Sequence, residues 1–203
     1  MASNENIEYP SMGEIGKGLE YVKSIPFVLK ISEIVVLLIA FSLPGHFLNE
    51  IYDEFLAYYE KKGNIDFFLF VTIVGWLIAI AFLIFFVIGI HEMISALPWT
   101  LVVAIVLAVW TILLLISSAL LAAAAKHYDD DIKTYGFFVS TNTSGCKLLD
   151  NANHDAQCWQ LIAGAIFGFI ATVLHAVDAV IHTHMFLTRG SIPQAVTIGA
   201  APA

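Results

Sequence analysis

The chain has 203 residues, of which 59% are hydrophobic and only 13% are charged. An average soluble domain is about half apolar and about a quarter charged. This chain, with a mean hydropathy of +0.83, has too few charges to cover a water-exposed surface. Its formal net charge of −8 repels phosphate and excludes nucleic-acid binding. The composition therefore indicates an integral membrane protein.

Four segments are long and apolar enough to be transmembrane helices, which need about 20 mostly apolar residues each. In chain order they are residues 26–43, 67–90, 98–125 and 159–186. Pro98 suits the first turn of the third helix, where its missing N–H has no partner to lose. Because lipid offers no partner to a free backbone group, the sequence predicts an all-α membrane protein, an antiparallel bundle of four transmembrane helices.

Four spans place both tails, residues 1–25 and 188–203, on one side of the membrane, and the connecting segments 44–66 and 126–158 on the other. The basic residues do not decide the orientation, because four lie on the tail side and five on the other side. The first 25 residues lack the apolar stretch of a cleavable signal peptide, so we expect the first span to stay in the product.

Two features of the second connecting segment favour cytoplasmic tails. Cys146 and Cys158 are the only two cysteines, and they suggest a disulfide formed in an oxidising lumen, with two unpaired thiols as the alternative. Asn142 begins an Asn-Thr-Ser glycosylation sequon, which requires a luminal face. We therefore expect cytoplasmic tails and luminal or extracellular connecting segments, at the plasma membrane or in secretory or endosomal vesicles.

Ionisable side chains occur inside two predicted spans, where each costs about 2.5–3.5 kcal/mol on insertion scales. Lys30 and Glu33 share a face of the first span, and His175, Asp178 and His182 share a face of the fourth. Both groups lie near the tail side of the bundle, so a contact between Lys30 and Asp178 is expected. We interpret Lys30, Glu33, His175 and Asp178 as a structural clamp, with a proton or ion relay as the alternative.

The histidine-rich face of the fourth span also permits a metal-site interpretation, because His175, Asp178, His182 and His184 carry suitable ligand atoms. Nothing in the sequence completes the coordination sphere, so no metal and no cofactor are predicted. The sequence also shows no nucleophile with a base, no phosphate-binding glycine loop and no zinc signature. We expect a protein that is not an enzyme.

Small residues at a four-residue spacing predict close approach of helix backbones. They are Gly164, Gly168 and Thr172 in the fourth span and Gly75 and Ala79 in the second. Packing inside the bundle is the favoured interpretation, and self-association is the alternative. The expected partners are the lipid bilayer, including sterol or ordered-lipid domains, and further copies of the chain or other membrane proteins.

Residues 45–62 show helical periodicity, with Phe47, Ile51 and Phe55 on an apolar face and acidic residues on the other. The pattern predicts a separate helix that lies in the membrane interface or caps the bundle. A docking surface for a partner is the alternative.

Short motifs, one in each span, carry a family resemblance. They are Leu-Lys-x-x-Glu at 29–33, the aromatic-rich residues 70–77, Pro98-Trp99, and the small-residue stretch 165–179 with its Asp178. Together they resemble the MARVEL family of four-helix membrane proteins, which includes plasmolipin, the myelin and lymphocyte protein and relatives of the chemokine-like factor. The resemblance covers residues 26–187. It implies a role in membrane apposition, vesicle trafficking, membrane-domain organisation or cell junctions.

The residues and the resemblance together lead to one expected function and two alternatives. We expect a non-catalytic multi-pass protein that organises membrane domains or vesicle carriers. The first alternative is a small proton- or ion-conducting transporter that uses Glu33, His175 and Asp178. The second is a cell-junction or adhesion component that acts through its luminal segments.

Overall fold

The computed structural model describes the chain in five stretches, residues 24–51, 61–89, 99–130, 144–151 and 155–190. Four long helices and one short helix occupy these stretches: α2 (Ile25–Glu50), α4 (Lys62–Ile88), α6 (Trp99–Asp129), α7 (Gly145–Asn151) and α8 (Cys158–Gly190). Each long helix is long and apolar enough to cross a membrane. The predicted all-α protein with four transmembrane helices is confirmed.

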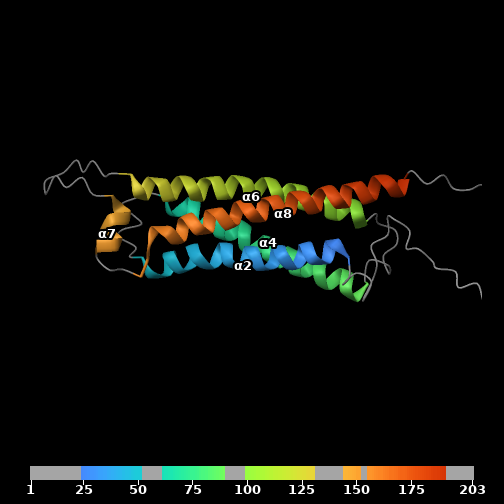
Figure 1. The fold of residues 1–203 in the computed structure, drawn as a ribbon, viewed down its shortest axis with the longest axis horizontal. Helices are drawn as coiled ribbons and strands as arrows, with labels where there is room; N and C mark the ends of the chain where they lie inside the picture. Colours follow the sequence, from blue (N-terminus) through green and yellow to red (C-terminus); the bar gives the residue numbers. More distant parts are fainter. Residues whose placement is uncertain (1–23, 52–60, 90–98, 131–143, 152–154, 191–203) are drawn as a thin grey trace, which may run out of the picture.

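The four long helices pack into one bundle (Figure 1). Each helix contacts the next one along the chain, and α8 returns to pack against α2. Consecutive helices run antiparallel, so the start of α2 and the end of α8 lie at the same end (Figure 1). We call this the terminal end, and we call the opposite end, where α7 lies, the disulfide end.

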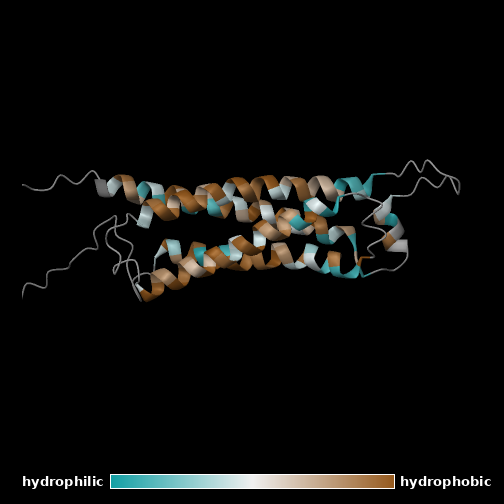
Figure 2. Cartoon of the chain, turned by 180° about the vertical axis from the view of Figure 1, so that it is seen from behind, coloured by the Kyte–Doolittle hydropathy of each residue, from teal (hydrophilic) through white to brown (hydrophobic). Residues whose placement is uncertain are grey.

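The outer surface of the bundle is apolar on every long helix. Exposed apolar side chains include Val28 on α2, Phe70 on α4, Ile112 on α6 and Val173 on α8. Figure 2 shows hydrophobic residues along most of the bundle and hydrophilic residues gathered towards the disulfide end. A surface of this kind exceeds what a soluble monomer exposes, and it fits contact with lipid.

The helices extend beyond the predicted spans, most clearly at α2. The first span was expected to end at residue 43, but α2 continues through Pro44 to Glu50. The prediction of a separate helix over residues 45–62 was therefore wrong for its first part, and residues 52–60 lie outside the described stretches. Proline is tolerated inside a membrane helix when neighbouring helices and local adjustments satisfy the freed backbone groups. Pro44 is buried in the bundle, and α2 stays helical on both sides of it.

The interior of the bundle consists of three apolar clusters along its length. The cluster at the disulfide end contains Phe47, Phe68, Leu121, Tyr128 and Leu161 among its buried members. A middle cluster is formed by Leu37, Val71, Leu114 and Ala171. The cluster nearest the terminal end is formed by Phe86, Val103, Leu107 and Ala179. All three clusters draw side chains from different helices, so burial of apolar surface is distributed along the whole bundle.

Candidate functional site: a buried ion cluster

The ionisable residues of α2 lie on its inward face, one helical turn apart. The Lys30 ammonium donates a hydrogen bond of 2.8 Å to Glu33 Oε2. The side chains of Lys30 and Glu33 are 1% and 0% exposed. A three-residue spacing puts two side chains on one helix face, so the sequence itself sets up this contact.

Asp178 connects the ionisable residues of α2 to α8. Lys30 Nζ lies 2.6 Å from Asp178 Oδ2, and the Asp178 side chain is fully buried. The contact has the distance of an ion pair but not the angles of a hydrogen bond. The structure therefore places the expected Lys30–Asp178 contact across two helices that are far apart in the sequence.

Two imidazoles on α8 flank Asp178. His182 Nδ1 lies 3.1 Å from Asp178 Oδ1 and 3.0 Å from the Asp178 carbonyl oxygen. His175 Nδ1 lies 3.0 Å from the Ala171 carbonyl oxygen and 3.7 Å from Glu33 Oε1. His182, which the four-residue spacing placed on this face of α8, thus belongs to the cluster as well. We use the name ion cluster for Lys30, Glu33, His175, Asp178 and His182.

Helix α4 contributes aromatic walls to the ion cluster. The Phe82 ring centroid lies 5.8 Å from Lys30 Nζ, and the Phe86 ring centroid lies 6.5 Å from the His182 ring. A cation within about 6 Å of an aromatic face is attracted by the ring quadrupole. Phe82 therefore adds to the stabilisation of the Lys30 ammonium without adding a charge.

The ion cluster is enclosed by protein on the side facing the disulfide end. Leu37 and Ala171 lie one turn beyond Glu33 and His175, and they pack with Val71 and Leu114 from the other two helices. These four side chains are fully buried and carry no polar atom. Coulombic attraction between the paired groups is strong in such an environment, and so is the cost of an unpaired charge.

The structure shows no metal geometry in the ion cluster. Within the five described stretches, no three His, Cys, Asp or Glu side chains are arranged to hold a metal ion. His184, the fourth residue of the metal-site interpretation, is exposed on the outer face of α8. What the printed distances show in this arrangement is ion pairing between α2 and α8.

The two glycines of the α8 packing motif face into the bundle. A Cβ at Gly164 would lie 2.8 Å from Pro44 Cδ on α2, and a Cβ at Gly168 would lie 2.7 Å from Phe68 Cε2 on α4. Both distances are shorter than normal carbon contacts. Thr172 continues this face, and its hydroxyl donates to the Gly168 carbonyl oxygen at 2.9 Å. This motif packs α8 against its own bundle.

Gly75 makes room for a contact that the sequence analysis missed. A Cβ at Gly75 would lie 2.9 Å from Trp110 Cδ1. The Trp110 indole N–H crosses from α6 to donate a 3.1 Å hydrogen bond to the Val71 carbonyl oxygen. Gly75 therefore leaves space for the Trp110 side chain of α6, and Ala79, one turn further along α4, is buried in the bundle.

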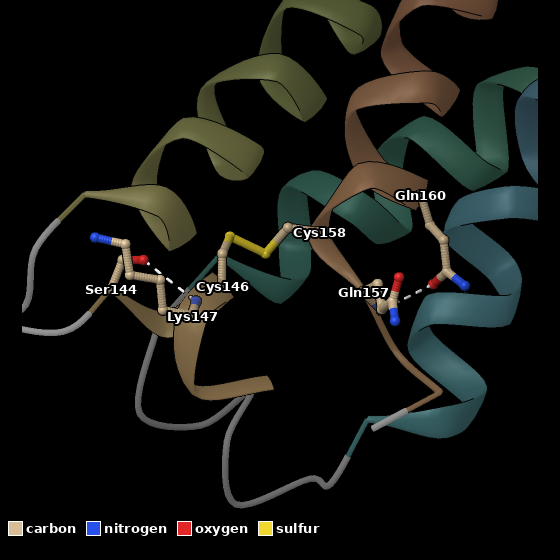
Figure 3. Close-up of a disulfide and its surroundings, with 6 residues drawn as sticks. All are labelled: Ser144, Cys146, Lys147, Gln157, Cys158 and Gln160. Carbon is tan, nitrogen blue, oxygen red and sulfur yellow. Dashed lines mark hydrogen bonds between the residues drawn. A yellow bond between two sulfur atoms is a disulfide. The ribbon is translucent and has the colours of Figure 1, made fainter. Parts of the chain in front are cut away.

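The cysteines form a disulfide at the disulfide end (Figure 3). Cys146 on α7 is bonded to Cys158, the first residue of α8. Ser144 Oγ accepts a hydrogen bond of 3.3 Å from the Lys147 N–H at the start of α7. The short helix α7 was not predicted from the sequence, and Asn142 lies outside the described stretches. The disulfide ties α7 directly to the beginning of α8.

The fold defines a class of protein, the integral membrane proteins with four membrane-spanning helices. The MARVEL family, described as a membrane-associating domain, matches residues 21–181. This range covers most of the chain, and the chain belongs to the MARVEL family. The search of curated proteins finds no significant match, and neither does the search of solved structures. Of the ion cluster, only His182 lies just outside the matched range.

Proposed function

We propose that this protein is a non-catalytic organiser of membrane domains or vesicle carriers. One observation carries the proposal: the ion cluster is buried inside the bundle, whereas the outer faces of the four long helices expose large apolar side chains. The two features together support a bundle that offers its apolar outer faces to lipid and to neighbouring membrane proteins. Such a bundle acts through lipid contact and through neighbouring membrane proteins.

The orientation belongs to the same proposal. We infer cytoplasmic tails, with the disulfide end in a lumen or outside the cell. The Cys146–Cys158 bond supports this, because structural disulfides persist in oxidising compartments. Glycosidase treatment of the expressed protein tests the orientation: a mobility shift that Asn142→Gln abolishes supports it, and a biotinylation reagent that reaches the tails of intact cells overturns it.

Partitioning in phase-separated giant vesicles tests the organiser function. We expect the reconstituted protein to concentrate in one lipid phase or at the phase boundary, and to change the size of the domains as its density rises. A protein that spreads evenly over both phases, and leaves the domains unchanged at all densities, contradicts the proposal. An unrelated single-span helix that carries the same fluorophore is the control for effects of the dye.

A proton- or ion-conducting transporter is the second candidate. The ion cluster favours it, because buried acids and histidines form proton relays in transporters. Against it stands the fully apolar layer of Leu37, Val71, Leu114 and Ala171 between the ion cluster and the disulfide end. Proton and cation flux in liposomes separates the two candidates. We expect silent vesicles. Flux that rises as the pH falls and is lost in Asp178→Asn would establish the transporter.

A junction or adhesion role through the luminal segments is the third candidate. Its support is the tertiary structure at the disulfide end, where α7 is bonded to α8. Localisation distinguishes it from the organiser: enrichment at cell–cell contacts that depends on residues 126–158 supports adhesion, and a vesicular distribution supports the organiser.

A further inference from the structure

The ion cluster carries an unbalanced charge when its groups are given their ordinary ionisation. Lys30 contributes one positive charge, Glu33 and Asp178 contribute one negative charge each, and neutral imidazoles contribute none. Among the residues that the structure describes on α4 and α6, none supplies the missing positive charge. The nearest ionisable residue on α4 is Asp66, which lies about 24 Å along the helix from Phe82 at 1.5 Å per residue. On α6 the basic residues are confined to the last turn, at the disulfide end.

An unbalanced charge is costly at this position. All five side chains of the ion cluster are at most 2% exposed. A buried charge without a partner loses the solvation of water and gains too little from protein dipoles to replace it. A buried group can avoid this cost by changing its protonation state. The ion cluster therefore needs one further positive charge, and a proton is the smallest ion that supplies it.

We propose that the ion cluster is an occluded proton-binding site and that Glu33 holds the proton as a neutral carboxylic acid. Distances separate the two carboxyl groups. Asp178 has a nitrogen near each oxygen, Lys30 Nζ at 2.6 Å and His182 Nδ1 at 3.1 Å. Glu33 accepts a hydrogen bond from Lys30 at Oε2, whereas Oε1 is buried without a hydrogen-bond partner and lies 3.7 Å from His175 Nδ1. The negative charge is thus better stabilised on Asp178, and the proton belongs on Glu33 Oε1.

The histidines are unsuitable for this proton, and a charge on His175 would make no hydrogen bond to Glu33 Oε1, 3.7 Å from its Nδ1, or to Asp178. His175 Nδ1 and His182 Nδ1 each lie 3.0 Å from a backbone carbonyl oxygen one turn earlier, Ala171 and Asp178 respectively, so each of these nitrogens already bears a hydrogen. A second proton on His182 would sit on Nε2, which is buried and has no hydrogen-bond partner. The result would be a charged N–H without an acceptor, which is costlier than a neutral acid whose O–H group lacks an acceptor.

The proton makes the cluster neutral and leaves one ion pair, Lys30–Asp178, across the α2–α8 contact. Glu33 then accepts the Lys30 hydrogen bond at Oε2 as a neutral group. This assignment concerns a bound proton rather than a conducted one, and it goes beyond the organiser function. Its failure and that of the organiser proposal are distinguishable, because the measurement below does not depend on lipid domains.

Infrared spectroscopy of the full chain in lipid nanodiscs tests the proposal. A protonated carboxylic acid has a C=O stretching band that an ionised carboxylate lacks, and the band shifts in D₂O. Water-exposed Asp and Glu side chains are ionised at neutral pH, so wild-type protein should show one such band. Glu33→Gln should remove it. Glu50→Gln, on the same helix at the disulfide end, should leave it unchanged.

Two further results sharpen the test. Gln is close in shape to a neutral glutamic acid, so Glu33→Gln should change the thermal midpoint by less than about 4 °C, the shift expected for roughly 1 kcal/mol in a chain of this size. Asp178→Asn should remove the infrared band without touching Glu33, because Lys30 then pairs with an ionised Glu33. A wild-type spectrum without the band, a band that persists in Glu33→Gln, or a Glu33→Gln protein that does not fold overturns the proposal.

Discussion

The contact between α2 and α8 is of a different kind in the two halves of the bundle. In the half near the terminal end, α2 and α8 meet through the buried pair Lys30–Asp178. In the half near the disulfide end, the same two helices meet through the close contact of Gly164 with the Pro44 ring. A disulfide adds a covalent tie at that end between α7 and α8.

A buried ion pair and apolar packing contribute differently to stability. Burial of an ion pair brings little net stability compared with apolar side chains of similar volume, but loss of one partner is strongly destabilising. Close apolar packing has the opposite character, since each contact is weak and the sum is large. The ion pair therefore fixes which helix faces meet, and the apolar clusters along the bundle supply most of the contact energy.

The largest expected effect comes from the ion cluster. Lys30→Met removes its permanent cation and leaves Asp178 buried without a counter-charge, so we expect a loss of about 3–5 kcal/mol in the free energy of unfolding. The measurement is unfolding in mixed detergent micelles with increasing fractions of denaturing detergent. Lys126→Met, the same substitution at an exposed position on α6, is the matched control and should stay within about 0.5 kcal/mol of wild type. Equal effects of the two variants would contradict this interpretation of the ion cluster.

The next effect comes from the disulfide. Cys146 and Cys158 are 12 residues apart in the chain, and closing a loop of this length stabilises a protein by about 2–4 kcal/mol in the chain-entropy account. The double variant Cys146→Ser/Cys158→Ser should lose stability in that range. Reductant should destabilise wild-type protein equally and leave the double variant unaffected. A reductant effect on the double variant would show that the loss has another cause.

The smallest effect comes from glycine packing at the disulfide end. In Gly164→Ala the new methyl group meets the ring of Pro44, which cannot rotate away, and Ala40 O at 3.3 Å. We expect a loss of about 1–3 kcal/mol from overpacking. Gly63→Ala is the matched control, because a Cβ there meets nothing within 4 Å. It should be neutral or stabilise α4 by up to about 1 kcal/mol through helix propensity. If the two alanines have the same effect, close packing at Gly164 is not what holds α8 to α2.

Much of the fold could be predicted because the bilayer imposes it. Apolar runs long enough to span lipid must be helical, and their order in the chain leaves an antiparallel bundle as the simple solution. The Lys30–Asp178 contact could also be anticipated, since both residues are costly in lipid and lie at a similar depth. Residue spacing alone was sufficient to place His175, Asp178 and His182 on one face of α8.

Other features depend on tertiary contacts that a single sequence does not encode locally. Proline usually ends a helix, so the continuation of α2 through Pro44 follows only from its burial against Gly164 on α8. Gly75 predicted a shallow groove, but the indole that fills it comes from Trp110, 35 positions later in the numbering. Helix α7 is too short for periodicity to identify it, and it is stabilised by the disulfide and by the contact of Ser144 with Lys147.

A double-mutant cycle on Lys30 and Asp178 tests the central claim, that one buried ion pair joins α2 to α8. The four proteins are wild type, Lys30→Met, Asp178→Asn and the double variant, compared by unfolding in mixed micelles. Removing both charges leaves no unpaired ion, so we predict that the double variant is more stable than Lys30→Met alone, with a coupling energy of at least about 1.5 kcal/mol. Losses that simply add would contradict the claim.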